Sequence, residues 1–322
     1  MKSFWLVLAG LCVSTLAYEQ SADKYAAVDQ FISALHLPAS NRSDLNRITD
    51  SISKTFQSDE FRARAAFKWV TEHIGYDCGN YSDSLLNRNS IEAILKSKKS
   101  LCSGFSNILV YMCRELKIEC VNINGYAKTS GRDLFVHADS MKNNHTWNAI
   151  KINNEWKLVD PTWASGYSDE NCSTVVKEFA GNYFFMSPDK MILTHYPADS
   201  NWQLLDHKIS KDEFLAQPVI HDAYYNNEIS SFSPATGVIE STLNGLILFK
   251  FKSNKILDKI GFWSPDKSIP QEWGSLRKDG DEYVYYYYVK TKSDFMLNIS
   301  INGGRTTLIY QVKVKSKKDR PA

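Results

Sequence analysis

Cys102 stands at the head of an amphipathic segment, SLCSGFSNILVYMCRELKI, in which apolar side chains recur at steps of three and four. That spacing is typical of one face of a helix. Ser100 is the expected N-cap, so Cys102 would lie in or beside the first turn, where unpaired amides and the helix dipole favour a thiolate. We expect Cys102 to act as a nucleophile, and Gly104 to leave room for a partner or substrate near its sulfur.

A base and a carboxylate follow in the stretch NNHTWNAIKINNEWKLVDPTW. Asn153 and Asn154 tolerate the positive φ angles of a two-residue hairpin turn. The register that this turn sets makes His145 and Asp160 diagonal neighbours on one face, roughly 5 to 8 Å apart at Cβ. A thiol nucleophile needs a base, and the base needs an orienting group. The spacing therefore predicts that His145 activates Cys102 while Asp160 holds His145.

The elements that must position these residues change type along the chain. Residues 26–73 read as helical, and SIEAILKS predicts a further short helix before Cys102. From Cys120 onwards, the alternating stretches ECVNINGYAK and HTWNAIKI predict strands. Between about residues 223 and 315, strand-rich runs are separated by turn signals at short intervals, which is typical of an antiparallel sandwich of immunoglobulin-like size.

In combination, these motifs resemble the transglutaminase-like superfamily of cysteine enzymes. The resemblance covers residues 61–163 and is carried by RARAAFKWVTEHIGYD, LCSGFSNILVYMCRELKIEC, INGYAK and the hairpin stretch. It is closest to the branch that contains the kyphoscoliosis peptidase, including YFFMSPDKMILTHYPADSNWQLL further on. The resemblance implies an α+β, papain-like core in which the nucleophile helix packs on an antiparallel sheet. It also implies triad roles for Cys102, His145 and Asp160.

Such an enzyme needs a second donor to the oxyanion besides the backbone amide of Cys102. Trp69, Tyr76 and Trp147 are candidates by their position near the motifs, and each also fits a packing role. The sequence contains no DxDxDG loop and no cluster of acidic residues. We therefore expect no metal and no cofactor, and a reaction that does not depend on calcium.

The ends of the chain and its cysteines indicate the cell compartment. Residues 1–17 read as a cleaved signal peptide, which predicts a secreted or periplasmic protein. A catalytic domain with its N-terminal helices would then occupy residues 18–215, and a β-sandwich with a short basic tail residues 216–322. Cleavage leaves five cysteines, so one thiol stays unpaired. We expect that thiol to be Cys102, and a disulfide between Cys78 and Cys172.

The net charge limits which classes of binding partner we expect. The formal charge is +2, from 38 basic and 36 acidic residues, which gives no argument for binding nucleic acid or an anionic membrane. We expect a protein or peptide substrate and no membrane insertion of the mature chain. Five N-x-S/T sequons occur, and a glycan at Asn144 would crowd His145.

Three functions are compatible with this sequence. The first is a secreted cysteine peptidase or amidase that acts through a thioester. The second is a calcium-independent acyl transferase that passes the same thioester to a lysine amine and crosslinks proteins. The third is a binding or adhesion protein that has lost catalysis. In the sandwich, Tyr286 and Tyr288 lie on the face opposite Tyr285 and Tyr287, so one of the two faces is an aromatic patch for a ligand or for the neighbouring domain.

Overall fold

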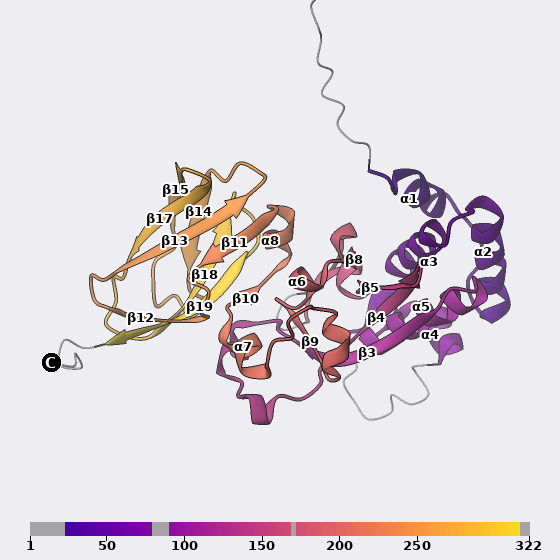
Figure 1. Ribbon diagram of the computed structural model, residues 1–322, viewed down its shortest axis with the longest axis horizontal. Coiled ribbons are helices and arrows are strands. Elements are labelled where there is room, and N and C mark those ends of the chain that lie inside the picture. The colour runs from indigo at the N-terminus through magenta and orange to yellow at the C-terminus, as the bar shows by residue number, and fades with distance from the viewer. Residues whose placement is uncertain (1–22, 79–89, 169–171, 316–322) are drawn as a thin grey trace, which may run out of the picture.

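The computed structural model describes residues 23–78, 90–168 and 172–315, which form two lobes side by side (Figure 1). Helices and a sheet make up the first lobe, and strands make up most of the second. The predicted signal peptide, the basic tail after residue 315, and the sequons at Asn80 and Asn171 lie outside the described residues. In the part of the chain that is described, no helix is both long enough and apolar enough to cross a membrane.

Five helices open the first lobe and confirm the helical reading of its sequence. They are α1 (Ala26–Ser33), α2 (Arg42–Thr55), α3 (Asp59–His73), α4 (Ile91–Ser97) and α5 (Cys102–Glu115). Local sequence explains where α3 begins, because the side chain of Ser58 accepts a hydrogen bond from the amide of Phe61 and two acidic residues occupy the first turn. The middle of α3 is buried, which lets it pack against α5.

A five-stranded antiparallel sheet supports these helices, in the order β8-β5-β4-β3-β9. Its strands are β3 (Cys120–Ala127), β4 (His145–Ile152), β5 (Glu155–Val159), β8 (Phe184–Met186) and β9 (His195–Pro197). Helix α5 packs on β3 and β4, as the sequence predicted. Two small pairs complete the lobe: β1 (Gly75–Tyr76) with β2 (Lys99–Ser100), and β6 (Gly166–Ser168) with β7 (Val175–Lys177).

Helix α5 begins at Cys102, but two details of its start differ from expectation. The N-cap is Leu101, without a side-chain cap, and the hydroxyl of buried Ser100 has no hydrogen-bond partner among the described residues. Ser100 therefore is not the cap, because it is the last residue of β2. The space beside Gly104 is filled by the protein itself, since an added Cβ would lie 1.8 Å from Oγ of Ser100 and 2.7 Å from Cδ1 of Ile94.

The second lobe consists of two facing sheets. One has the order β10-β19-β18-β14-β15, with β12 also paired to β19, and the other the order β11-β13-β17-β16. The strands are β10 (Val219–Ile220), β11 (Ile229–Ser233), β12 (Val238–Thr242), β13 (Leu246–Ser253), β14 (Lys259–Trp263), β15 (Glu272–Ser275), β16 (Arg277–Asp279), β17 (Glu282–Tyr288), β18 (Phe295–Ile301) and β19 (Leu308–Lys315). All the pairs are antiparallel except β12 with β19. The sandwich is thus confirmed, with one parallel pair at its edge.

The run of tyrosines in β17 separates into an inner and an outer face. Tyr287 is buried and its ring lies 4.7 Å from that of Phe262, whereas Tyr286 and Tyr288 are exposed. Because Tyr286 and Tyr288 are exposed, this face does not pack against the first lobe. Of the two roles expected for it, packing on the neighbouring domain is excluded, and binding a ligand stays a prediction.

Short helical turns connect the elements and join the lobes. They are α6 (Pro188–Met191), α7 (Lys211–Ala216), α8 (Asp222–Asn226), η2 (Gly131–Phe135), η3 (Ala138–Ser140), η4 (Trp163–Ser165), η5 (Gly181–Tyr183) and η6 (Ser200–Gln203).

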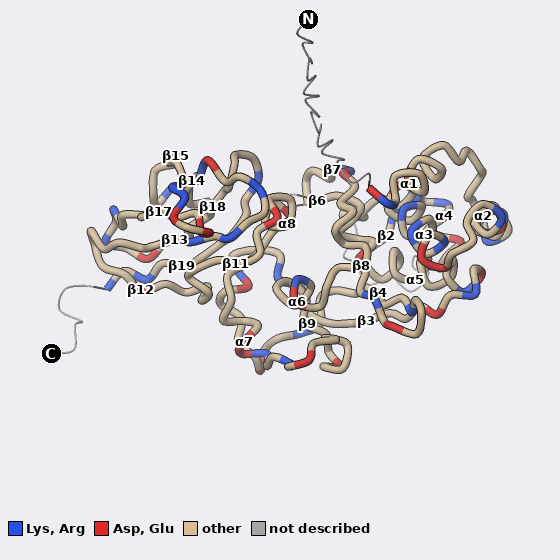
Figure 2. Tube along the Cα trace, turned by 45° about the horizontal axis from the view of Figure 1, so that its top comes forward, with Lys and Arg blue, Asp and Glu red and all other residues tan. Residues whose placement is uncertain are grey.

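Polar and apolar contacts join the lobes, and η2 packs against β19. Within the first lobe, the ammonium of buried Lys128, just after β3, donates to the carbonyl oxygens of Phe214 and Gln217 at the end of α7. The hydroxyl of Tyr183 bonds the carboxylate of Asp222 in α8. Basic and acidic residues alternate along both lobes, without a face of one sign (Figure 2).

Candidate active site

The β4–β5 hairpin has the register that its sequence predicts. Asn153 and Asn154 have φ angles of 50° and 65°, as a tight hairpin turn requires. The ladder runs from Ile152 opposite Glu155 to Asn148 opposite Val159. This register brings His145, the first residue of β4, beside Asp160, the residue that follows β5.

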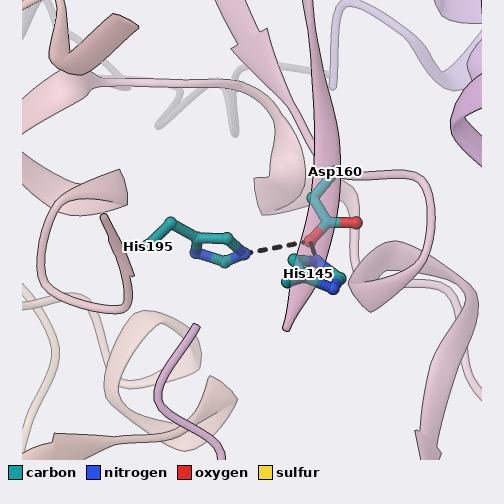
Figure 3. A group of neighbouring side chains, drawn as sticks. All are labelled: His145, Asp160 and His195. Carbon is teal, nitrogen blue, oxygen red and sulfur yellow. Dashed lines mark hydrogen bonds and ion pairs between the residues drawn. The ribbon is translucent and has the colours of Figure 1, made fainter. Parts of the chain in front are cut away.

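His145, Asp160 and a second histidine, His195, form one buried hydrogen-bonded group (Figure 3). Nε2 of His145 lies 2.7 Å from Oδ2 of Asp160, and Nε2 of His195 lies 3.0 Å from the same oxygen. The other oxygen, Oδ1, accepts from the backbone amides of Thr162 (2.8 Å) and Trp163 (3.0 Å). Every acceptor position of the Asp160 carboxylate is therefore used.

These bonds fix the charge of each member of the group. Burial opposes the ionised form of Asp160, but the charge of His145 and the hydrogen bonds from both histidines hold its pKa well below the usual range. Burial alone would lower the pKa of His145, but Asp160 and, to a smaller extent, Cys102 raise it to about 10. Burial lowers the pKa of His195, so His195 is neutral and donates its Nε2–H to Asp160.

Cys102 faces the other side of His145. His145 and the backbone amide of Thr146 lie close enough to the sulfur to lower the pKa of the thiol. Burial raises the pKa of the thiol, but the bond to His145, its charge and the Thr146 amide outweigh burial and leave the pKa below the ordinary value. Cys102 is a free thiol at the first position of α5. The structure thus brings Cys102, His145 and Asp160 together in the predicted order.

The helix and the sheet are connected directly behind this group. The hydroxyl of Ser106 in α5 donates to the carbonyl oxygen of Thr146 at 3.1 Å. The side-chain amide of Asn148 in β4 donates to the carbonyl oxygen of Ser106 in α5 (3.4 Å) and to that of Val121 in β3 (3.2 Å). These bonds fix how far the first turn of α5 lies from the start of β4.

The histidine–aspartate–histidine group also resembles a set of metal ligands, and its geometry tests that reading. Its ligand atoms lie within 4.8 Å of one another. Tetrahedral zinc with bonds of about 2.0 Å separates its ligand atoms by roughly 3.3 Å. The two separations to Oδ2, 2.7 and 3.0 Å, are shorter than that and match hydrogen bonds instead. The three residues therefore fit a hydrogen-bonded histidine–carboxylate–histidine group better than a metal centre.

The three aromatic candidates for an oxyanion donor lie in different surroundings. Trp69 is buried in α3 and stacks on His73, with ring centres 4.6 Å apart. Trp147 is buried beside His145, and its indole nitrogen has no hydrogen-bond partner among the described residues. Tyr76 pairs with Ser100 through β1 and β2, and of the three it is the one that lines the cleft beside His145.

His195 is the site residue that the sequence reasoning missed. It begins β9, whose partner strand is β3, with Ala127 opposite His195. Thr194 lies on its other side, with Oγ1 2.7 Å from Nδ1 of His195. The one signal was its place in the stretch ILTHYPADS, which carried part of the resemblance but suggested no role.

The side chain of Asn144, the residue before His145, is hydrogen-bonded to the backbone of β3. Its side-chain oxygen accepts from the amide of Ala127 at 2.7 Å, and its side-chain nitrogen donates to the carbonyl of Ala127 at 3.0 Å. The amide thus extends the pairing of β3 and β4 up to His145. A glycan on this nitrogen would disturb the contact that positions His145.

The cysteines pair as predicted. Cys78 and Cys172 form a disulfide, with Cα atoms 5.2 Å apart and a separation of 94 positions in sequence. Cys113 and Cys120 are free thiols in contact, and their hydrogen bond and burial raise the pKa of Cys113. Cys102 is thus the free thiol that borders His145.

A cleft of about 1100 Å³ opens between the two lobes and reaches His145. In the first lobe His145, Trp163 and the β6–β7 hairpin line it, and the disulfide Cys78–Cys172 lies at its wall. In the sandwich, it is lined by Trp263, Asn298 and Arg305. A molecule in this cleft would touch both lobes.

Comparison with known proteins shows which family the first lobe is similar to. Residues 46–161 match the model of the transglutaminase-like superfamily. The kyphoscoliosis peptidase of Mus musculus is 31% identical over 247 residues, which cover 76% of this chain and 36% of that protein. The Lim and transglutaminase domain protein ltd-1 of Caenorhabditis elegans is 21% identical over 279 residues, covering 84% of this chain and 35% of that protein. This chain spans about a third of the length of these two relatives.

Among solved structures, a chain described as "Crystal structure of a TGase" is similar at 16% sequence identity and a TM-score of 0.30. The match covers 54% of this chain and 40% of that one.

Proposed function

Because residues 46–161 form a domain of the transglutaminase-like superfamily, we propose that this protein is a cysteine hydrolase that cuts amide bonds of peptides or proteins. One observation carries the proposal: a free thiol at a helix start lies beside a histidine that a buried carboxylate holds. The raised pKa of His145 and the lowered pKa of Cys102 both favour a thiolate–imidazolium pair. Among the described residues no other cysteine borders a histidine in this way.

The first half of the reaction forms a thioester. The thiolate of Cys102 attacks the carbonyl carbon, and the negative charge moves to the carbonyl oxygen. The amide N–H of Cys102, in the first turn of α5 and without an acceptor within the helix, is placed to donate to that oxygen. His145 gives its proton to the leaving amine as the C–N bond breaks. Cys102 then carries the acyl group, and His145 is neutral.

The second half releases the acid. A water molecule attacks the thioester while His145 takes its proton, and the C–S bond breaks. Cys102 leaves as the thiolate and His145 is again the imidazolium. Asp160 stabilises this imidazolium at both ends of the cycle without changing protonation, because its lowered pKa keeps it ionised.

We place this activity outside the cytoplasm, in a secreted or periplasmic protein. The apolar leader supports that location, and so does the disulfide between Cys78 and Cys172, because disulfides form and persist in oxidising compartments.

One experiment separates hydrolysis from its nearest alternative. The protein is incubated with casein and a biotinylated primary amine, and the products are mapped by mass spectrometry. Hydrolysis gives new chain ends or free acids, whereas acyl transfer gives glutamine side chains that carry the amine. Cys102→Ala is the control. Amine incorporation without hydrolysis would replace the hydrolase by the acyl transferase, and equal products from the Cys102→Ala protein would refute both.

A further inference from the structure

We propose that the cleft between the lobes holds an extended polypeptide, and that the sandwich, through Asn298, contributes half of its binding site. The proposal rests on the proposed function, because it describes the substrate of the same site. It makes the second lobe part of substrate recognition rather than a separate module.

The size and position of the cleft favour a ligand that is longer than one small amide. Its volume of about 1100 Å³ lies at the upper end of the range for small-molecule pockets. It begins at His145 and Trp163 and continues to Trp263 and Arg305 on the sandwich. Several residues of an extended chain fit such a space, and a single side chain does not fill it.

A buried polar atom without a partner lies on each wall. In the first lobe it is Oγ1 of Thr162, and in the sandwich it is Oδ1 of Asn298; each residue is 7% exposed and lines the cleft. Folded proteins leave few such groups unpaired, because each costs free energy until it finds a partner. A polypeptide backbone carries donors and acceptors at every residue, so one extended chain can satisfy both walls at once.

The walls are held at a fixed separation. Arg305, on the loop between β18 and β19, pairs with Glu178 at 3.2 Å, and its guanidinium lies 4.1 Å from the ring centre of Tyr167 in the β6–β7 hairpin. Figure 2 shows this hairpin between the two lobes. The contact between Tyr183 and Asp222 adds a second connection nearby. These contacts join the two walls of the cleft next to the residues that line it.

The test uses Cys102 as its own reporter and needs no turnover. The rate at which iodoacetamide alkylates Cys102 is measured with increasing concentrations of glycine- and serine-rich peptides of two or ten residues. We expect the ten-residue peptide to protect Cys102 at a concentration at least tenfold lower than the dipeptide. Equal protection by both lengths would overturn the proposal.

Two variants locate the contacts. Asn298→Leu and Thr162→Val remove the polar atoms while keeping similar volume, and each should raise the half-protecting concentration of the long peptide about three- to tenfold. Asn254→Leu, on an exposed turn of the sandwich, is the matched control and should match wild type. The alkylation rate without peptide is measured for every variant, and protection is expressed relative to that rate; Asn254→Leu should have the basal rate of wild type.

The outcomes separate this proposal from the proposed function. Long-peptide protection that Asn298→Leu weakens, in a protein that hydrolyses nothing, would keep the cleft and reject the hydrolase. If the protein hydrolyses casein but Asn298→Leu leaves peptide protection unchanged, the hydrolase is kept and the role of Asn298 in the cleft is rejected. Melting temperatures of the variants are measured in parallel, and Asn298→Ser replaces Asn298→Leu if the leucine variant does not fold.

Discussion

Both lobes have an apolar core, but the first lobe also buries a group of ionisable side chains. In the first lobe, two histidines and an aspartate are buried together, and their hydrogen bonds satisfy every acceptor of the carboxylate. In the sandwich, Phe249 lies between Phe262 and Tyr310, with ring centres 5.8 and 5.6 Å away. A buried polar group is costly unless fully paired, whereas buried aromatic surface stabilises the fold directly. We therefore expect the buried polar group of the first lobe and the aromatic cluster of the sandwich to respond to separate mutations.

The largest effect should come from the thiol. We expect Cys102→Ala to lower turnover about 10⁴-fold or more, because no other group can form the thioester. The melting temperature should stay close to that of wild type, since the removed sulfur is half-buried and makes no disulfide. Turnover of casein and thermal unfolding measure the two quantities. Substantial turnover by a well-folded Cys102→Ala protein would contradict the mechanism.

The opposite result is expected for the aromatic core. Phe249→Ala should lower the free energy of unfolding by about 3 to 5 kcal/mol, because it leaves a cavity among fully buried rings. The alkylation rate of Cys102 at a temperature where the variant is still folded should not change. Denaturant unfolding and alkylation are measured on the same sample. A change in both quantities would show that the lobes are coupled through more than the shared cleft.

Local patterns predicted the part of the site that local structure builds. The periodicity of α5 placed Cys102 at a helix start, and the two asparagines set the register that joins His145 to Asp160. Both follow from residues close in sequence, where the rules of helix faces and tight turns apply.

Long-range packing decided what the sequence did not predict. His195 reaches Asp160 because β9 pairs with β3, two strands separated by almost seventy residues of chain. Ser100 was wrongly expected to be a cap, because the pairing of β1 with β2 takes it into a strand. Gly104 was expected to open space for a partner, but Ile94 and Ser100 occupy it. The residues next to Gly104 in sequence do not indicate which side chains from other elements will pack beside it.

A pH profile tests how the buried pair sets the reactivity of the thiol. A free cysteine has a pKa of about 8.5, and His145 holds the pKa of Cys102 below its ordinary value. The rate of alkylation by iodoacetamide should therefore rise at a lower pH than it does for a free cysteine. In His145→Ala the rise should move up by at least about one pH unit, because burial alone raises the pKa of the thiol. Identical profiles for the two proteins would show that His145 does not activate Cys102.

The last prediction concerns His195, which does not line the cleft. Its Nε2–H takes up part of the charge of Asp160, so its removal leaves more of that charge acting on His145. In His195→Leu the pKa of His145 should rise further, and a less acidic imidazolium transfers its proton to the leaving amine more slowly. We expect kcat to fall about ten- to a hundredfold with KM unchanged, and the alkaline limb of the activity profile to move to higher pH. His195→Gln keeps an N–H donor and should recover most of the rate and the original limb. A role limited to filling space would affect the glutamine and leucine variants alike and would leave the limb where it is, so the contrast between them decides whether the buried polar group acts as one unit.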